Sequence, residues 1–346
     1  MFDENSNVVK IGIIGGGLGI RCLLPKFNEI SGVKVVAFLS SNYQRTLEIS
    51  QKYEIEHLCR DIEDMGNLNL DLVCVASPSK EHYWQAEYLI GKNICVLCEK
   101  PLCLVQSDID MLINKAKTFS STLFIDLELR FNPYFKKIKE LLRTIGKVYY
   151  VDMFFQSSLY LTQDIKNTWN YSEKEGGGIR LAILPHFLDL LYFWLDKECT
   201  SLRGRLYNAH EREGVSEFCN VSLFLEDDIT VNLAATAIIE GDKELDITII
   251  GEHGKIEFDL QHKLRLDRKD VPVDLPEYYV DEESIFRSSF ACYAHILIDA
   301  IRKGKVIDSF TTEKQIRGIH RLLEDIKSSS NRGREVIYKP ETDKFS

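Results

Sequence analysis

The sequence predicts a two-domain protein of mixed class. An N-terminal α/β domain carries a doubly wound parallel sheet, and a C-terminal α+β domain carries a large, mostly antiparallel open sheet with helices on one face. Three observations support this. An apolar strand at residues 8–14 enters a glycine-rich turn and then a helix-like stretch. Strands and helices then alternate as far as residue 127. From residue 147 onward, strand-like runs follow one another closely, several with the period-two alternation of a sheet covered on one face.

The first domain, residues 1–127, is predicted from the order of its segments. Its strands are expected at the apolar runs, which are residues 8–14, 34–39, 70–76, 93–98 and 121–127. Helices are expected between them, at residues 22–27, 43–52, 83–90 and 108–117. Because strands alternate with helices, the sheet should be parallel and its connections right-handed.

The second domain, residues 128–346, is predicted from its strand-like runs. These are residues 148–155, 201–207, 217–225, 229–239, 245–250 and 255–260. The apolar stretch 184–195 is long enough for a buried helix, and residues 287–301 and 312–328 are predicted as closing helices. We expect the outer face of this sheet, which is only weakly polar, to support a homodimer or homotetramer.

Composition excludes several classes of protein. A length of 346 residues with 45% hydrophobic residues is enough for two buried cores. A formal net charge of −10 argues against nucleic acid as a partner, because there is no basic excess to neutralise phosphates. No apolar run reaches the ~18–20 residues that cross a bilayer, and the acidic start lacks a signal-peptide core. We expect a cytoplasmic protein that is not bound to a membrane.

The nine cysteines are scattered, which indicates free thiols in a reducing compartment. Cys95 and Cys98 have the spacing of half a metal or redox site. No second pair accompanies them, and strand alternation places the two on opposite faces. We therefore predict no metal.

The glycine turn points to a dinucleotide. Gly15 allows the tight turn, and Gly17 lets backbone N–H groups approach a pyrophosphate at a helix N-terminus. The third position of the G-x-G-x-x-G pattern falls on Ile20, with Gly19 one residue early. The position of the turn, directly after the first strand, supports a nucleotide-binding role.

The end of the second strand bears on which dinucleotide binds. An acidic residue there usually holds the ribose hydroxyls of NAD. Residues 39–45 contain no carboxylate, whereas Ser40, Ser41 and Arg45 can donate to a 2′-phosphate. The alternative is an ordinary polar loop. We predict NADP in preference to NAD.

Four landmarks together resemble the Gfo/Idh/MocA oxidoreductase family, which includes glucose–fructose oxidoreductase and inositol dehydrogenase. They are Ser77-Pro78 with His82 after the third strand, Glu99-Lys100-Pro101 after the fourth, Gly176-Gly177-Gly178 before Pro185-His186-Phe187-Leu188-Asp189, and Gly251-Glu252-His253-Gly254 late in the chain. The resemblance extends from about residue 10 to residue 336. It implies an enzyme that uses NAD(H) or NADP(H) to oxidise or reduce a hydroxyl or ketone of a sugar, a sugar derivative or a nucleotide sugar.

The resemblance also assigns roles to residues. Lys100 and His186 would be catalytic, with Lys100 aimed by a cis peptide bond before Pro101. The residues implied to bind the cofactor are Gly15, Gly17, Leu18, Gly19, Ser40, Ser41, Asn42, Arg45, Ser77, Pro78, His82, Glu99 and Lys100. Those implied to line the substrate site are Arg130, Trp169, Arg180 and Asp189. The alternative interpretations without a catalytic role are a solvated Lys100 in a turn and a core histidine at position 186.

The chain departs from the commonest family pattern near His186. Many members carry an aspartate four residues before this histidine, and that position is Ala182 here. Arg180 stands where an apolar residue is usual. Some members with alanine at the position of Ala182 carry Gly-Ser before the histidine, whereas this chain has Leu184-Pro185. Ala182 and the missing Gly-Ser motivate a second hypothesis, a cofactor-binding regulator or scaffold that retains the fold with little or no turnover.

Overall fold

The computed structural model describes residues 8–119, 121–161, 168–208, 215–261, 263–279, 284–305 and 308–338. The chain forms two compact units, each built from two segments. The first unit contains Met1–Asn132 and Glu277–Arg317, and the second contains Pro133–Pro276 and Gly318–Ser346. We describe the two units separately.

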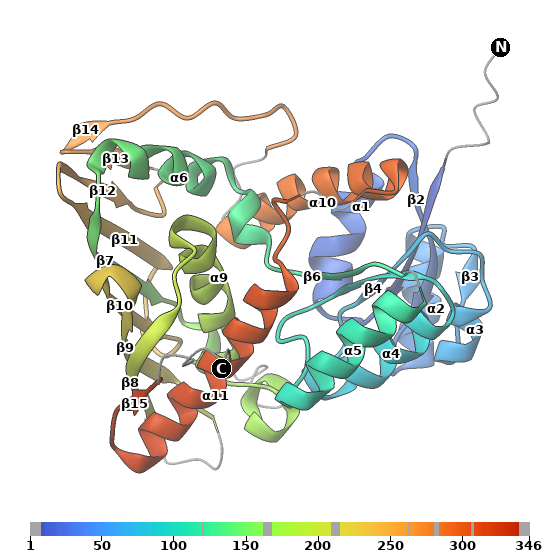
Figure 1. The fold of residues 1–346 in the computed structure, drawn as a ribbon. Coiled ribbons are helices and arrows are strands. Elements are labelled where there is room, and N and C mark those ends of the chain that lie inside the picture. The colour runs from blue at the N-terminus through green and yellow to red at the C-terminus, as the bar shows by residue number, and fades with distance from the viewer. Residues whose placement is uncertain are drawn as a thin grey trace, which may run out of the picture. The chain divides into compact units, whose positions relative to one another are not determined.

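The first unit is built on a parallel sheet in the order β3-β2-β1-β4-β5-β6 (Figure 1). The strands are β1 (Val9–Ile14), β2 (Val33–Leu39), β3 (His57–Leu58), β4 (Leu72–Val75), β5 (Cys95–Cys98) and β6 (Leu123–Ile125). Its helices are η1 (Gly19–Leu23), α1 (Leu24–Asn28), α2 (Tyr43–Lys52), α3 (Ile62–Gly66), η2 (Ser79–Glu81), α4 (His82–Gly91), α5 (Gln106–Thr118), η3 (Glu128–Phe131) and α10 (Ile285–Lys303). The predicted parallel sheet with alternating helices is confirmed.

Helices cover both faces of this sheet. On one face, side chains of α1 and α10 join Ile11, Ile13 and Leu72 in a single apolar core. On the other, Met65 of α3 packs so closely that a Cβ at Gly12 would lie 2.5 Å from its sulfur atom. The central strand β4, Leu72–Val75, is apolar and buried along its whole length because both faces of the sheet are covered.

Helix α10 packs with the first unit, although it follows the second sheet in sequence. Phe290, Tyr293 and Leu297 are buried in the first unit's core, and the Tyr293 ring stacks on Phe131 at 4.6 Å between centroids. The predicted division placed every residue after 127 in the second domain. Residues 277–317 return to the first unit because the apolar face of α10 completes that core.

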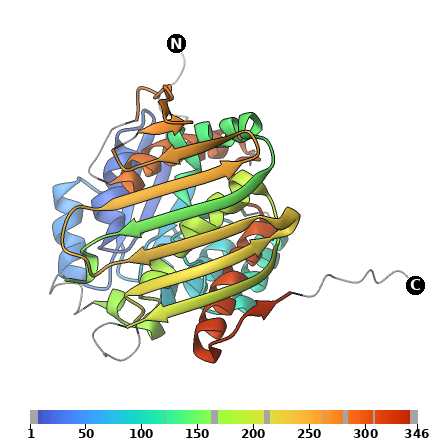
Figure 2. The ribbon, with the colours of Figure 1, turned by 90° about the vertical axis from the view of Figure 1, so that its left-hand side faces the viewer.

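The second unit is built on a mixed sheet in the order β14-β13-β12-β11-β7-β10-β9-β8-β15 (Figure 2). The strands are β7 (Val148–Gln156), β8 (Cys199–Tyr207), β9 (Phe218–Leu225), β10 (Thr230–Thr236), β11 (Glu244–Gly251), β12 (Gly254–Phe258), β13 (Leu264–Leu266), β14 (Lys269–Asp270) and β15 (Val336–Ile337). All pairs are antiparallel except β10 with β7. The predicted large, mostly antiparallel sheet is confirmed.

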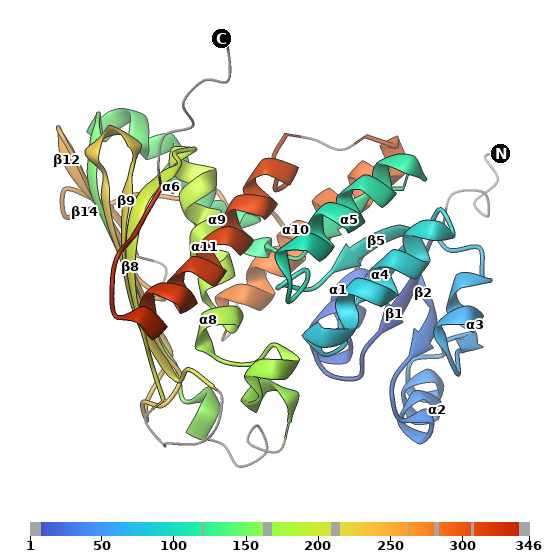
Figure 3. The same ribbon diagram turned by 60° about the horizontal axis from the view of Figure 1, so that its bottom comes forward.

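Helices of the second unit lie on one side of this sheet (Figure 3). On this side lie α6 (Pro133–Ile145), α8 (Ile179–Ala182), α9 (Leu184–Leu195) and α11 (Glu313–Arg332), whose first turn belongs to the first unit. The short helices of the unit are η4 (Leu159–Leu161), η5 (Trp169–Tyr171), η6 (Glu173–Glu175) and η7 (Glu226–Asp228). The indole N–H of Trp194 donates to the Phe135 carbonyl at 3.0 Å and joins α9 to α6. Against β8, a Cβ at Gly204 would lie 2.8 Å from the Ile326 carbonyl oxygen of α11, so only glycine allows this approach.

Within the described part of the chain, no single helix is both long and apolar enough to span a membrane. One bent pair, Glu173–Ala182 with Leu184–Leu195, passes the same test by length and composition, with a bend of 48°. Helix α9, the longer member, is almost entirely buried in the second unit.

Candidate active site

The glycine turn follows β1 at the middle of the first sheet. Gly15 has φ +122°, and a Cβ there would lie 2.1 Å from the Ala76 carbonyl oxygen, so no other residue fits. The space around Gly17 is open, because a Cβ placed there would have no described atom within 4 Å. Gly19 packs against β1, since its Cβ would lie 2.8 Å from Ile13 Cγ2. The three glycines therefore provide a turn, an open backbone and a close helix–strand contact.

The helix after this turn begins with a π-helical turn, η1, in which the Leu24 N–H donates to the Gly19 carbonyl. A π-helical turn is one residue longer than an α-helical turn. Gly19 begins this turn and is the glycine that packs on the strand. Gly19 therefore has the packing role of the third glycine, although it lies one residue earlier than the G-x-G-x-x-G pattern places it.

The loop after β2 is held by its own side chains. The Ser40 N–H donates to Thr46 Oγ1 at 3.1 Å, and Ser40 Oγ donates to the Asn42 carbonyl at 2.9 Å. Asn42 caps α2 by accepting from the Arg45 N–H at 3.2 Å. Ser40 and Asn42 therefore shape the loop, while Ser41 is exposed.

The Arg45 side chain lies against the glycine turn. A Cβ at Gly16 would be 3.2 Å from Arg45 Nε, and the residue is exposed. No ion pair to a described residue engages its guanidinium group. The first turn of α2 carries no acidic residue, so this corner presents a helix N-terminus and a cation to a ligand.

A buried histidine joins the loops that follow β4 and β5. His82 Nδ1 lies 2.8 Å from the Pro101 carbonyl oxygen, and Nε2 lies 2.9 Å from the Ser77 carbonyl oxygen. A neutral ring donates to one of these carbonyls and a charged ring to both. Burial lowers the pKa of His82, although the two carbonyls oppose that shift. Ser77 Oγ also donates to Gln85 Oε1 at 2.6 Å, which fixes the first loop on α4.

The Glu99-Lys100-Pro101 turn continues from β5. The Glu99 N–H donates to the Val75 carbonyl at 2.9 Å, which extends the ladder of β4 and β5 by one residue. The Lys100–Pro101 peptide bond is cis, as the family resemblance implied. Strands β1, β4 and β5 are parallel neighbours, so the glycine turn, the Ser77 loop and Lys100 all follow carboxyl ends at one edge of the sheet.

In the second unit, the glycine triplet fixes the start of α8 and α9. Gly176 and Gly178 have φ of +93° and +98°. A Cβ at Gly177 would lie 2.1 Å from the Asn170 carbonyl oxygen, so the triplet packs against the backbone of η5, which carries Trp169. His186 lies in the first turn of α9 and Asp189 one turn later, and both are buried within this unit.

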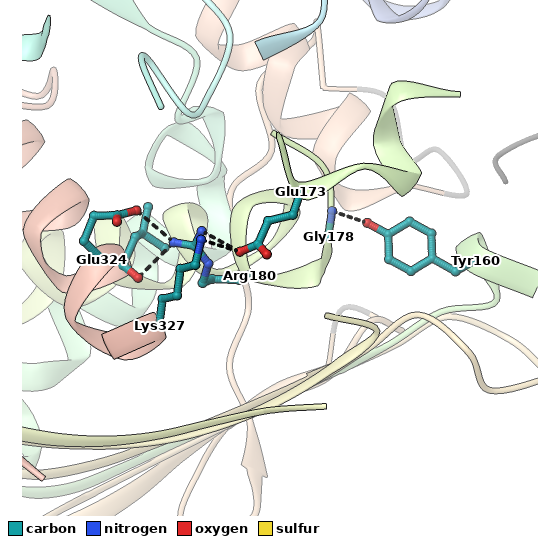
Figure 4. A network of polar contacts seen from close by, with 7 residues as sticks. Tyr160, Glu173, Gly178, Arg180, Glu324 and Lys327 are labelled. Atoms are coloured by element: carbon teal, nitrogen blue, oxygen red, sulfur yellow. Dashed lines mark hydrogen bonds and ion pairs between the residues drawn. The ribbon is translucent and has the colours of Figure 1, made fainter. Parts of the chain in front are cut away.

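Arg180 is buried in α8 and bound by protein groups (Figure 4). Its Nη1 donates to the Leu323 carbonyl at 2.9 Å and to Glu324 Oε1 at 3.2 Å. Its Nη2 donates to Glu173 Oε1 at 3.3 Å, and Lys327 pairs with the same Glu173 oxygen at 3.0 Å. The predicted contact of Arg180 with substrate stays a prediction, and its observed partners tie α8 to α11.

Arg130 has a similar environment in the first unit. It is 2% exposed, and its guanidinium group donates to the Ser309 carbonyl and to Gln315 Oε1, both at 3.3 Å. Asn132 donates to Ser289 Oγ at 2.9 Å. These residues anchor the chain as it leaves the first sheet, and the substrate role of Arg130 stays a prediction.

Sequence reasoning missed one feature of the first unit. Asp126, directly after β6, is 3% exposed and hydrogen-bonded to the carboxyl group of Glu99. The alternation Asp126-Leu127-Glu128 at the end of an apolar strand was the available signal. Among the described residues, no group of three or more His, Cys, Asp or Glu side chains has the arrangement of a metal site.

Two family models match consecutive parts of the chain. Residues 9–127 match the oxidoreductase family with an NAD-binding Rossmann fold, and residues 135–257 match the GFO/IDH/MocA C-terminal domain. The chain therefore belongs to the GFO/IDH/MocA oxidoreductase family. It is an NAD(P)-dependent oxidoreductase.

Individual relatives agree with this family. An uncharacterised oxidoreductase of Synechocystis is 22% identical over 304 residues, which cover 82% of either chain. A scyllo-inositol 2-dehydrogenase (NADP⁺) of Bacillus subtilis is 28% identical over 142 residues, 41% of this chain and 43% of that protein. The crystal structure of myo-inositol 2-dehydrogenase from Lactobacillus plantarum superposes with a TM-score of 0.80 at 18% identity, over 96% of this chain and all of that one. The last comparison establishes the fold alone.

The steric roles of Gly15 and Gly17 predict opposite results for the same substitution. Gly15→Ala should destabilise the protein by at least about 1–3 kcal/mol from backbone strain alone, with the clash against Ala76 in addition. Gly17→Ala should leave the free energy of unfolding within about 0.5 kcal/mol of wild type and weaken dinucleotide binding only. Denaturant unfolding and calorimetric titration measure the two effects. Equal stability of both variants would contradict the assignment.

Proposed function

We propose that this chain transfers a hydride between the nicotinamide of NADP(H) and a secondary hydroxyl or ketone of a sugar or cyclitol. The observation that carries the proposal is the clustering of the Gly15 turn, the Ser77 loop and Lys100 at one edge of the first sheet. The name of the Bacillus subtilis relative, a scyllo-inositol dehydrogenase that uses NADP⁺, supports the substrate class. No observation on the described residues favours the alternative of a regulator without turnover.

The residues at the glycine turn fit a dinucleotide. Gly17 leaves its backbone open, and Leu18 beside it is exposed. We assign the pyrophosphate to the N–H groups of residues 17–19 at the start of η1. Pro78 and Ser77 would border the nicotinamide, and His82, whose ring contacts both neighbouring loops, stays a predicted cofactor-binding residue.

A nicotinamide held beside the Ser77 loop and Lys100 would supply hydride transfer to or from the carbinol carbon. Lys100 would place its ammonium group against the substrate oxygen and stabilise the negative charge that develops there. His186 would accept the hydroxyl proton during oxidation and return it during reduction. Since Ala182 supplies no carboxylate, the histidine would act without the acidic neighbour that many family members have. Trp169 and Asp189, both in the second unit, would contact the substrate.

The preference for NADP rests on the corner formed by β2 and α2. Ser41 is exposed, Arg45 lies against the glycine turn, and no acidic residue is present between Leu39 and Arg45. A carboxylate at this place would repel a 2′-phosphate, whereas a guanidinium group binds it in a charge-assisted geometry. Ser40 and Asn42 contribute by holding the loop that carries these donors.

Arg45→Ala therefore should weaken NADPH binding about 10–100-fold, the loss expected for one hydrogen-bonded charge, and leave NADH binding nearly unchanged. Wild type should bind NADPH more tightly than NADH. Fluorescence titration of both cofactors measures this, with Arg332→Ala in the second unit as a control of equal charge change. A wild-type preference for NADH would contradict the assignment.

The catalytic roles assigned to Lys100 and His186 predict that removing either side chain lowers kcat. Lys100→Met should lower kcat about 10²–10³-fold, because it removes the charge that stabilises the developing oxyanion. His186→Ala should lower kcat about 10²–10⁴-fold and flatten the pH profile near neutrality. Steady-state kinetics with inositols and sugars, and circular dichroism for folding, measure these effects. Full turnover in both variants would show that neither residue is catalytic.

We also propose a homodimer or homotetramer that pairs through the outer face of the second sheet, in a reducing, cytoplasmic setting. Phe224 and Ile250 are exposed on this face at 40% and 39%, which supports an apolar contact. All nine cysteines are free thiols, eight of them buried, and this supports the reducing setting.

A dimer or tetramer should appear in light scattering at micromolar concentration, and Phe224→Asp should shift it toward a monomer by placing a charge in the contact. Asn114→Asp, at an exposed position of α5 in the first unit, controls for added charge alone. A monomeric wild type would contradict this proposal.

A further inference from the structure

Two acidic residues lie side by side, each directly after one of two neighbouring strands. Strands β5 and β6 pair Cys98 with Ile125, so Glu99 and Asp126 are the next residues on each. The Asp126 N–H donates to the Cys98 carbonyl at 2.8 Å. Glu99 is 8% exposed, Asp126 is 3% exposed, and their carboxyl groups are hydrogen-bonded to each other.

A hydrogen bond between two carboxyl groups requires a proton, because two carboxylates have no donor. Two ionised carboxylates at this separation, away from water, would repel each other strongly. Two further oxygens of the pair, Glu99 Oε1 and Asp126 Oδ1, are buried and have no hydrogen-bond partner among the described residues. The pair is therefore poorly solvated and holds one proton.

The surroundings decide which carboxyl carries the proton. Burial raises the pKa of Glu99, and this shift is opposed by the charge of Lys100, by the hydrogen bond with Asp126 and by the Lys100 backbone N–H, which donates to the Glu99 carboxyl group. Burial, the Glu99 carboxylate and the Glu128 carboxylate raise the pKa of Asp126 well above its ordinary value, while Lys100 opposes this shift. Asp126 is the protonated member.

The other elements packed around Asp126 also contribute titratable or charged groups. These groups are Cys22 of η1, Cys74 of β4, Cys98 of β5 and Tyr293 of α10, with Arg287 close to Cys22 and Arg130 close to Tyr293. Burial raises the pKa of every thiol in this set and of the Tyr293 phenol, so all are neutral near pH 7. The carboxyl groups and Lys100 are the charges in closest contact with the pair.

We propose that Asp126 is a positioning residue for the turn that carries Lys100: it donates a hydrogen bond to Glu99 and leaves the carboxyl pair with one negative charge beside the positive charge of Lys100. This inference rests on the proposed role of Lys100 at the cofactor. Loss of the proton would place a second negative charge under the turn, and we expect cofactor affinity to fall at alkaline pH for this reason.

The same proton links the pair to stability. The folded pKa of Asp126 is higher than its unfolded value of 3.8, so the folded state binds more protons between these two values. Stability from the protonated pair is fully present below pH 3.8 and is lost as the pH rises through the folded pKa. Asp126→Asn removes this dependence, so its stability relative to wild type should increase with pH.

The test compares three variants of the full-length protein by NADPH titration from about pH 6 to about pH 10. Asp126→Asn keeps a donor that does not titrate, so it should bind like wild type at neutral pH and lack the alkaline loss. Asp126→Ala removes the donor and should weaken binding about tenfold or more at neutral pH. Glu128→Gln removes one neighbouring charge, so it should move the alkaline loss to lower pH without abolishing it.

Infrared difference spectroscopy gives a readout that does not depend on the cofactor. Wild type near pH 7 should show the carbonyl stretch of a protonated carboxyl group, and Asp126→Asn should lack it. One outcome separates the two proposals: wild type shows this band but does not bind NADPH, and Asp126→Asn lacks the band. In that case the proposed function is wrong and the shared proton is confirmed. An unchanged band or an unchanged alkaline loss in Asp126→Asn overturns the inference.

Discussion

The edge of the first sheet depends on the hydrogen bonds of one buried imidazole. His82 has one ring nitrogen 2.9 Å from the Ser77 carbonyl oxygen and the other 2.8 Å from the Pro101 carbonyl oxygen, so a single side chain contacts the loops after both β4 and β5. Parallel pairing has already brought these strand ends to one edge. The imidazole converts that proximity into a fixed spacing between the Ser77 loop and the turn that carries Lys100. Preorganisation of this kind matters because electrostatic stabilisation needs a charge that does not have to be repositioned during the reaction.

The second unit uses a buried charge and close backbone packing for the same purpose. Arg180 joins α8 to α11 through a carbonyl and a carboxylate. Gly177 packs directly on the Asn170 carbonyl. Together they hold the segment that leads into α9. They therefore fix the position of the first turn of α9, which contains His186. A buried guanidinium group is costly unless it is paired, which gives Glu173 and Glu324 a structural role that their partial exposure alone would not suggest.

Local signals predicted much of the fold. Alternating strands and helices gave the first sheet, and the apolar run at 184–195 coincided with α9 (Leu184–Leu195). The return of α10 to the first core could not be predicted, because an amphipathic helix carries no mark of the sheet it covers. The glycine turn was also predicted from the sequence, and the cis peptide bond before Pro101 was implied by the family resemblance. The partners of Arg130, Arg180 and Asp126 were not predicted, because they depend on residues distant in sequence, such as Ser309, Leu323 and Glu99.

The central claim is that the edge formed by the glycine turn and Lys100 is an NADP site. A crystal structure of the protein grown with NADPH tests it most directly. We predict density for the pyrophosphate at the backbone of residues 17–19, the 2′-phosphate beside Arg45, and the nicotinamide ribose beside Lys100. Dinucleotide density elsewhere on the protein, or a 2′-phosphate facing away from Arg45 with Lys100 remote from the nicotinamide, would contradict the account.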